Sequence, residues 1–289
     1  MAGSALARRL LAASRPLSWV NTAYPFAAAY LLAGGGVTWV LALGTVFFLV
    51  PYNLAMYGIN DVFDYASDAA NPRKGGVEGA LLEPGVHRQV LVAAVAACVP
   101  FVAVLVALGG PASWAVLAVS LLAVAAYSVP GLRFKERPVL DSRTSSTHFT
   151  GPAVYGLVLA GGVWSRPAVL ALVAFFLWGV AAQAFGAVQD VVPDRQAGLA
   201  SVATALGAAR TVRLALTLWA AAGVLLLAEP FPGLLAAPLV VPYLALAWPY
   251  RSVADESSAA AHGGWRRFLA VNYVVGFLVT LILITMGRS

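Results

Sequence analysis

Three carboxylates that follow an asparagine carry the clearest chemical signal in the sequence. Asn60 is followed by Asp61, Asp64 and Asp68, a spacing that places three carboxylates on one face of a helix. Like charges held together repel unless cations neutralise them, and magnesium binds through one or two carboxylates together with water and phosphate oxygens. The stretch therefore predicts a magnesium site in which Asn60 adds a neutral oxygen ligand. The alternative is a solvated helix end without a ligand.

A second acidic pair stands later in the chain. Asp190 and Asp194 are four residues apart at the end of an apolar stretch, where ionisable groups are costly and point to function. Two carboxylate groups in one chain suit a diphosphate that magnesium ions bridge to the protein. We therefore expect both groups to bind metal, with Asp64, Asp68, Asp190 and Asp194 as the catalytic acids.

Several polar side chains are candidates for binding the diphosphate itself. Arginine donates a fork of hydrogen bonds to phosphate oxygens, and lysine supplies a mobile point charge. For any one cation the alternative is a charge that sets topology or meets lipid headgroups. Asn21 is expected to be buried in the first helix, where it either holds the diphosphate or joins helices. The predicted diphosphate-binding residues are Asn21, Asn60, Arg73, Lys74, Arg133, Lys135 and Arg137.

Other side chains are candidates for contact with the reacting atoms. Tyr127 ends an apolar stretch and faces either the reacting centre or the membrane interface. His148 is either the base that accepts the final proton or an interhelical hydrogen-bonding residue, and Gln183 has the same two interpretations. Met56 and Tyr57 are expected to line the cavity, whereas most other aromatic residues are expected to serve packing or the interface.

The elements that must position these residues are membrane helices. The chain has 289 residues, of which 61% are hydrophobic and 10% charged, and its mean hydropathy is +0.84. A hydrocarbon core of about 30 Å needs roughly 20 apolar residues per helix. We predict an all-α polytopic membrane protein with a single domain over residues 1–289 and a helical core over 16–286. The nine predicted spans are 16–34, 37–59, 88–109, 111–128, 144–163, 166–189, 210–228, 233–250 and 267–286.

The distribution of charge predicts the orientation. The net charge of +6 has no basic helix or aromatic-basic patch beside it, so nucleic acid is not an expected partner. The N-terminus and the loops after the even-numbered spans hold 16 of the 18 Lys and Arg residues, which predicts that this face is cytoplasmic in a bacterial inner membrane. The same segments hold 11 of the 12 acids, which suggests an ion-binding cytoplasmic chamber. The N-terminal stretch is expected to be a retained helix rather than a cleaved signal peptide, and Cys98 a packing residue.

The motifs and their order resemble a known family. An NDxxDxxxD motif, a YSxPxxRxKxRPxxD loop and a DxxxDxxxG motif follow the second, fourth and sixth predicted spans. In the types and the order of these motifs, the chain resembles the UbiA superfamily of intramembrane prenyltransferases. The resemblance covers about residues 15–285. The resemblance implies nine helices around a lipid-facing cavity, a cytoplasmic cap, an isoprenyl diphosphate substrate and Mg2+. It also implies phosphate-binding roles for Arg133 and Lys135.

Two departures from the quinone-pathway pattern point to one branch of that family. Residues 71–80 read NPRKGGVEGA, and Gly198 stands where many members carry a third acid. The first stretch resembles the lycopene elongase branch, which implies prenyl transfer from dimethylallyl diphosphate to lycopene in C50 carotenoid biosynthesis, with other carotenoid-pathway enzymes as possible partners. An aromatic acceptor of the quinone, haem or chlorophyll type is the alternative within the family. A secondary transporter is the alternative of another class, and it predicts scattered midplane acids rather than acids on one face.

Overall fold

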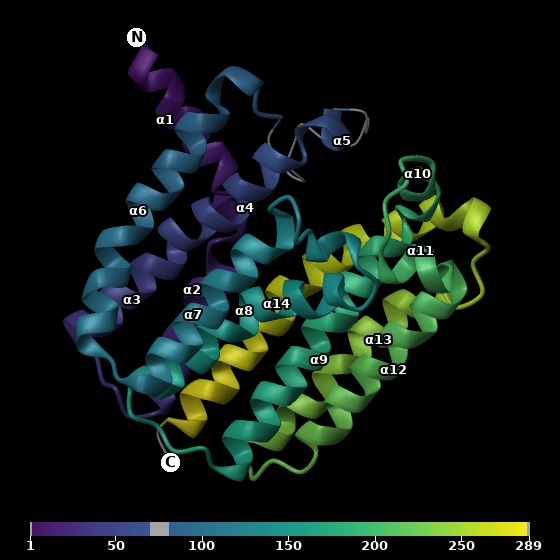
Figure 1. The fold of residues 1–289 in the computed structure, drawn as a ribbon. Helices are drawn as coiled ribbons and strands as arrows, with labels where there is room; N and C mark the ends of the chain where they lie inside the picture. The colour runs from purple at the N-terminus through teal and green to yellow at the C-terminus, as the bar shows by residue number, and fades with distance from the viewer. Residues whose placement is uncertain (1, 70–80, 288–289) are drawn as a thin grey trace. The chain divides into compact units, whose positions relative to one another are not determined.

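The structure is a computed structural model that describes residues 2–69 and 81–287 (Figure 1). Within these ranges the chain forms α-helices and short 3-10 helices joined by turns, and no strand. The predicted all-α class is therefore confirmed. The chain divides into two compact units, Met1–Arg133 with Gly151–Gly162, and Phe134–Thr150 with Val163–Ser289. The single domain expected over residues 1–289 stays a prediction.

The first unit contains the first acidic motif. It begins with a helix, α1, that the predicted span from residue 16 did not include. Its elements are α1 (Ala2–Ala13), η1 (Pro16–Ser18), α2 (Val20–Leu32), α3 (Trp39–Leu49), α4 (Pro51–Phe63), α5 (Tyr65–Ala69), η2 (Pro84–Val86), α6 (His87–Leu108), α7 (Pro111–Ser128) and the second half of α8 (Leu140–Leu159).

The second unit contains the second acidic motif. It starts with the first half of α8 and the 3-10 helix before it. Its other elements run to the C-terminal helix. They are η3 (Phe134–Glu136), α9 (Arg166–Val188), α10 (Val191–Gln196), α11 (Val202–Leu206), α12 (Ala208–Leu226), η4 (Gly233–Val240), α13 (Val241–Ala247), η5 (Trp248–Tyr250), η6 (Asp255–Ala261) and α14 (His262–Met286).

Proline decides where several helices begin. Pro51 opens α4 and Pro111 opens α7, and a proline at this position gives up only an N–H that has no partner inside the helix. A proline also crowds the residue before it, and Val50 has a distorted φ of −117° while its ψ of −62° stays helical. The span predicted as one helix over residues 37–59 is divided at this point into two helices, α3 and α4.

The described part of the chain contains seven segments long and apolar enough to cross a membrane, so the chain is a multi-pass membrane protein. Two predicted spans are not among the seven. The span 16–34 corresponds to α2, which has 13 residues, and the span 144–163 to α8, which has 20 residues but begins with a polar run. The predicted count of nine and the cytoplasmic cap stay predictions. The seven segments are Trp39–Phe63, Pro84–Leu108, Pro111–Ser128, Arg166–Val188, Ala208–Leu226, Gly233–Tyr250 and Asp255–Met286.

Aromatic rings fill the core of each unit. In the first unit the ring centroid of Phe26 lies 5.2 Å from that of Phe48 and 6.1 Å from that of Tyr155. In the second unit Trp219 lies 5.6 Å from Tyr243. These five side chains are buried, and such ring pairs add about 0.5–1.5 kcal/mol each beyond the area they bury. Packing is thus the role of these aromatic residues, as expected.

Candidate active site

The first acidic motif begins on the last turn of α4. Asn60 and Asp61 lie within the helix, Asp64 is its C-cap residue, and Asp68 lies on α5. The Asp64 amide donates to the Asn60 carbonyl at 2.9 Å, and the Asp68 amide donates to the Asp64 carbonyl at 2.8 Å. The single helix expected from the spacing is therefore interrupted at Asp64, although helical hydrogen bonds continue on both sides. All three carboxylates are buried.

Asp61 is held by a cation from the N-terminal segment. The Nη2 atom of Arg15 lies 2.7 Å from the Oδ1 atom of Asp61, and the two side chains are 18% and 0% exposed. The guanidinium also lies over the ring of Tyr57, 4.3 Å from its centroid. A charge-assisted hydrogen bond of this length is of the strong kind. The sequence offered Arg15 only as a topological charge, so this contact was missed.

Asn60 connects the motif to α7. Its Nδ2 atom donates to the Oγ atom of Ser128 at 3.0 Å and to the carboxylate of Asp64. Both amide protons are thereby used, and the other polar atom of the side chain, Oδ1, is an acceptor. A neutral oxygen of this kind is a ligand that a hard divalent cation accepts.

Arg133 stands beside Asp64 in a looser contact. Its Nη2 atom is 3.6 Å from the Oδ1 atom of Asp64, and its Nη1 atom is 3.5 Å from the carbonyl oxygen of Phe63. The first distance is too long for a hydrogen bond, and the side chain is 28% exposed. The backbone of Arg133 has φ 40°, a left-handed conformation that non-glycine residues rarely adopt. The structure thus brings this predicted phosphate-binding arginine to the first motif.

The second motif occupies one short helix. Asp190 is the N-cap residue of α10 and Asp194 lies inside it. The Asp194 amide donates to the Asp190 carbonyl at 2.9 Å, so the two acids are one turn apart on the same side. The helix ends at Gln196. Gly198, two residues later, has φ 70°, and the Leu199 amide donates to the Asp194 carbonyl at 2.8 Å. This ending favours glycine, which gives a backbone reason for Gly198.

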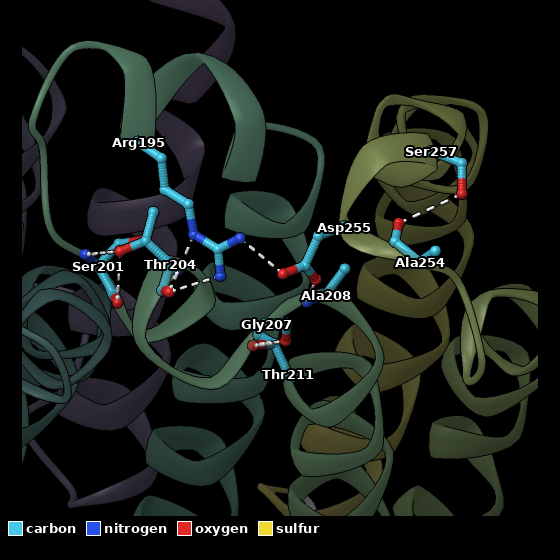
Figure 2. A network of polar contacts seen from close by, with 9 residues as sticks. All are labelled: Arg195, Ser201, Thr204, Gly207, Ala208, Thr211, Ala254, Asp255 and Ser257. Atoms are coloured by element: carbon cyan, nitrogen blue, oxygen red, sulfur yellow. Dashed lines mark hydrogen bonds and ion pairs between the residues drawn. The ribbon is translucent and has the colours of Figure 1, made fainter.

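Arg195 joins α10 to two other segments of the second unit (Figure 2). Its Nη1 atom donates to the Oδ2 atom of Asp255 at 2.6 Å, and its Nη2 atom donates to the Thr204 carbonyl at 2.9 Å. The Oδ1 atom of Asp255 accepts from the amide of Ala208 at 2.6 Å. Ala208 is the first residue of α12, whose N–H has no partner inside the helix. One carboxylate therefore holds the second-motif helix and caps α12.

The acid that closes the loop motif has a structural role. Asp141 is buried, and its Oδ2 atom accepts from the amide of Val202 at 2.7 Å, while its Oδ1 atom accepts from the amide of Ser142 at 2.7 Å. Burial raises the pKa of Asp141, and these hydrogen bonds to the ionised form act in the opposite direction. Asp141 thus fastens the start of α8 to the start of α11.

Asn21 is exposed, so its predicted burial was wrong. The buried polar residue of α2 is its neighbour Thr22, whose hydroxyl donates to the Phe48 carbonyl at 2.6 Å and accepts from the Nδ2 atom of Asn53 at 2.7 Å. Successive residues of an α-helix point about 100° apart, so an error of one position exchanges the two faces. A role for Asn21 in diphosphate binding stays a prediction.

The cations that follow Arg133 have contacts of their own. The Nζ atom of Lys135 is 4.0 Å from the Oε1 atom of Glu136, and the guanidinium of Arg137 lies 5.6 Å from the centroid of the Phe134 ring. Phosphate binding by Lys135 and Arg137 stays a prediction. Arg73 and Lys74 lie outside the described residues.

The remaining candidates lie in or beside helices of both units. Tyr127 is half-buried near the end of α7, and His148 is buried in α8. The Oε1 atom of Gln183 accepts from the Oγ atom of Ser145 at 3.0 Å, which favours the interhelical interpretation for Gln183. Met56 is buried.

An apolar cavity lies among α4, α6 and α7 of the first unit. Its volume is about 450 Å³, in the range of ligand pockets. Ile59, which precedes Asn60 in α4, is among its lining residues. A lining of this kind accommodates a hydrocarbon chain and excludes water. Residues from three helices contribute to it: Ala55 and Ile59 from α4, Cys98 and Val102 from α6, and Leu121 and Val124 from α7.

The donor atoms of the two motifs fit magnesium. Among the residues that the structure describes, no three His, Cys, Asp or Glu side chains form a ready-made metal cage. Magnesium does not require one, because it binds through one or two carboxylates and completes its octahedron with water and substrate phosphate oxygens. Each motif offers buried or half-buried carboxylates, and oxygen-only donors suit a hard cation. The residues present thus fit a magnesium ion that arrives with a diphosphate.

Comparison with known proteins agrees with the motifs. The model of the UbiA prenyltransferase family matches residues 22–272. A lycopene elongase/hydratase of Corynebacterium glutamicum is 49% identical over 281 residues, which are 97% of this chain and 98% of that protein. The C(50) beta-cyclic carotenoids biosynthesis protein LbtBC of Dietzia sp. (strain CQ4) is 55% identical over 277 residues, which are 94% of this chain and 63% of that longer protein.

The fold is also that of solved members. The structure of a UbiA homolog from Archaeoglobus fulgidus bound to GPP and Mg2+ superposes with a TM-score of 0.65 at 18% identity, covering 92% of this chain and 99% of that chain. The family resemblance inferred from the order of the motifs is confirmed by these matches. The chain belongs to the UbiA prenyltransferase family.

Proposed function

We propose that this protein transfers a prenyl group from dimethylallyl diphosphate to lycopene in C50 carotenoid biosynthesis, with magnesium as the cofactor. Relatives named lycopene elongase/hydratase or C(50) carotenoid biosynthesis protein support the acceptor. The observation that carries the chemistry is the cluster at the end of α4, where Asn60, Asp64 and Arg133 lie together within the first unit.

The first motif is proposed to supply oxygen ligands for the metal. Asp61, Asp64 and Asp68, with the Oδ1 atom of Asn60, would hold magnesium, and the ion would supply charge neutralisation that makes diphosphate a better leaving group. Arg133, 3.6 Å from Asp64, is proposed to bind phosphate oxygens with its forked donors.

Roles in donor binding are also proposed for the second motif and the loop. Asp190 and Asp194, one turn apart, would be the second set of metal ligands. Lys135 and Arg137 are proposed to bind diphosphate oxygens, because both are cations on a polar loop outside the apolar segments. Asn21, exposed on α2, is assigned the same role.

The reaction breaks one C–O bond and forms one C–C bond. The electron pair of the C–O bond leaves with the diphosphate, and a terminal double bond of lycopene attacks the allylic cation. The tertiary cation that results loses a proton, or takes up water and then loses a proton. His148 is the proposed acceptor, because it is a buried neutral imidazole, one of whose ring nitrogens can accept a proton. Tyr127, at the end of α7, is the proposed neighbour of the reacting atoms.

The charge distribution supports an orientation for this reaction. We assign the N-terminus and the motif-bearing loops to the cytoplasm of a bacterial cell, because 16 of the 18 Lys and Arg residues are in those segments. Both proposed substrates are then within reach, since the diphosphate is water-soluble and the polyene is dissolved in the bilayer. Association with other carotenoid-pathway enzymes stays a prediction.

Expression in a lycopene-producing bacterium tests the proposal. Pigments separated by chromatography are expected to be heavier than lycopene by one or two C5 units, with or without added water. The matched control is Asp64→Asn, which is expected to be present in the membrane and to leave lycopene unchanged. Unchanged lycopene with the wild-type chain in the membrane would refute the lycopene acceptor. Transfer to an added aromatic acid instead would establish the aromatic alternative.

A further inference from the structure

Two arginines of the second unit are joined by a hydrogen bond. The Nε atom of Arg213, on α12, donates to the carbonyl oxygen of Arg251 at 3.0 Å, and Arg251 directly follows η5. Both side chains are exposed. Arg210 stands three residues before Arg213 on α12 and is exposed as well, so the two share one side of the helix. Three arginines are therefore gathered at one end of the second unit.

Trp248 holds the guanidinium of Arg251. The Nη1 atom of Arg251 donates to the Trp248 carbonyl oxygen at 3.0 Å, and the guanidinium lies over the Trp248 ring, 4.6 Å from its centroid. Tryptophan attracts a cation more strongly than the other aromatic side chains do. Trp248 is nevertheless 57% exposed. The ring therefore holds Arg251 and still presents apolar surface to its surroundings.

No acid neutralises this cluster within the part of the chain that the structure describes. Neither Arg213 nor Arg251 forms an ion pair with a described Asp or Glu side chain. The next acid along the chain, Asp255, binds Arg195 and the amide of Ala208 instead. The forked N–H donors of arginine suit the oxygens of a phosphate when no carboxylate takes them. The cluster thus has the composition of an anion-binding site.

The position of the cluster favours a lipid over a soluble anion. Two apolar segments, Ala208–Leu226 and Gly233–Tyr250, have ends next to each other here. Arg213 lies on the second turn of α12, and a long side chain in such a place extends its charged end to the headgroup level. Tryptophan is enriched at that level, because its ring is apolar and its N–H is polar. A soluble phosphate would gain nothing from the exposed ring, whereas a lipid contacts both the ring and the charges.

We infer that Arg213, Arg251 and Trp248 form a binding site for the phosphate headgroup of an anionic phospholipid. The two guanidiniums bind the phosphate oxygens, and the exposed part of the Trp248 ring packs against the start of the acyl chains. Arg210 adds positive charge beside them. The site contains no residue of either acidic motif and needs neither magnesium nor a prenyl donor, so the inference does not depend on the proposed function.

Native mass spectrometry of the purified full chain, which counts bound lipid molecules, tests this site with phosphatidylglycerol and with phosphatidylcholine, which has no net charge. An arginine near an anionic headgroup contributes a factor of about five in affinity. We therefore expect the wild-type chain to prefer phosphatidylglycerol by about 25-fold at this site. Arg213→Gln and Arg251→Gln should each weaken phosphatidylglycerol binding by about fivefold, and the double variant should bind the two lipids alike. An unchanged affinity in Arg213→Gln would overturn the inference.

The matched control is Arg88→Gln. Arg88 is exposed on the first turn of α6, on the face that we assign to the same side of the membrane, but it belongs to the first unit. A lone interfacial arginine does not form the site, so this variant should bind phosphatidylglycerol like the wild-type chain. A loss in Arg88→Gln equal to that in Arg213→Gln would show that overall charge attracts the lipid, and would refute a specific site.

Inorganic pyrophosphate distinguishes a lipid site from a site for a soluble phosphate compound. An excess of pyrophosphate should leave phosphatidylglycerol bound to the wild-type chain. Displacement of the lipid, together with weaker pyrophosphate binding in Arg213→Gln, would assign the cluster to a soluble anion and refute the lipid site.

Thermal unfolding shows whether each variant is folded. Arg213 is exposed, so Arg213→Gln should hardly change Tm, and this variant alone decides the outcome if Arg251→Gln does not fold. Added phosphatidylglycerol should raise the Tm of the wild-type chain more than that of Arg213→Gln, because a ligand stabilises the folded state that binds it. An equal rise in both would count against the site.

Discussion

Replacement of Asp255 separates two contributions of one carboxylate at the second motif. Its Oδ1 atom accepts from the Ala208 amide and its Oδ2 atom from Arg195, both at 2.6 Å. Asp255→Ala removes the helix cap and the ion pair together. Asp255→Asn keeps an oxygen for the amide and loses only the charge. The difference between the two variants therefore measures the cap.

The contacts set the expected magnitudes. Loss of a helix cap costs about 1 kcal/mol. The ion pair adds only about 0.5 kcal/mol, because the side chains of Arg195 and Asp255 are 44% and 30% exposed and water screens them. Arg195 keeps its hydrogen bond to the Thr204 carbonyl, so no unpaired charge is buried. For a domain of similar size Tm falls by about 2–4 °C per kcal/mol, which predicts about 3–6 °C for Asp255→Ala and about 1–2 °C for Asp255→Asn.

Intrinsic tryptophan fluorescence of the purified chain during heating in detergent measures these shifts. The control is Ser257→Ala, because Ser257 lies in the same 3-10 helix and its hydroxyl makes one exposed hydrogen bond, of 3.2 Å, to the Ala254 carbonyl (Figure 2). We expect no measurable shift in this variant. If Asp255→Asn lowers Tm as much as Asp255→Ala, the charge and not the cap dominates, and the calculation above is refuted.

Three other substitutions test separate parts of the molecule. Asp190→Asn should abolish prenyl transfer with the protein still in the membrane, and pigment analysis showing normal products would remove Asp190 from the metal site. Gly156→Ala should lower the free energy of unfolding by about 1–3 kcal/mol, because the added Cβ would lie 2.4 Å from the Phe26 carbonyl oxygen. Gly276→Ala, where the added Cβ meets open space, is the control. Equal shifts of Tm in the two variants would contradict this reasoning. Gly198→Ala should destabilise the end of α10 by about 1 kcal/mol, because alanine rarely adopts the φ of 70° found at this position. The expected result is faster proteolysis at α10, and an unchanged cleavage rate would count against the prediction.

The membrane segments could be predicted because length and breakers determine them. The span predicted over residues 111–128 is α7 with the same bounds, and the span predicted over 88–109 is α6, His87–Leu108. Two glycines between the two helices and the proline that opens α7 mark the loop, and hydrocarbon thickness sets the length of each helix. The same reasoning did not find the break between α3 and α4, because Pro51 lies inside a continuous apolar run.

The partners of charged residues could not be predicted in the same way. Arg15 pairs with Asp61, 46 residues later, and Arg195 pairs with Asp255, 60 residues later. Helical periodicity predicts which residues share a face of one helix. It does not predict which residues of another element pack against that face. The positive-inside rule accounts for the presence of Arg15 near the N-terminus and is silent about its contacts.

The error at Asn21 has a cause specific to membrane proteins. In a soluble helix the polar residues mark the outward face, so periodicity identifies the buried one. In α2 the side chains on both faces are mostly apolar, because lipid takes the place of water. A single polar residue in such a helix does not identify which face is buried in the protein. Thr22, not Asn21, is the buried member, and its partner Asn53 lies on α4. The first motif poses the same problem on a smaller scale, since its acids are alike in the sequence and only the structure shows that Arg15 pairs with Asp61.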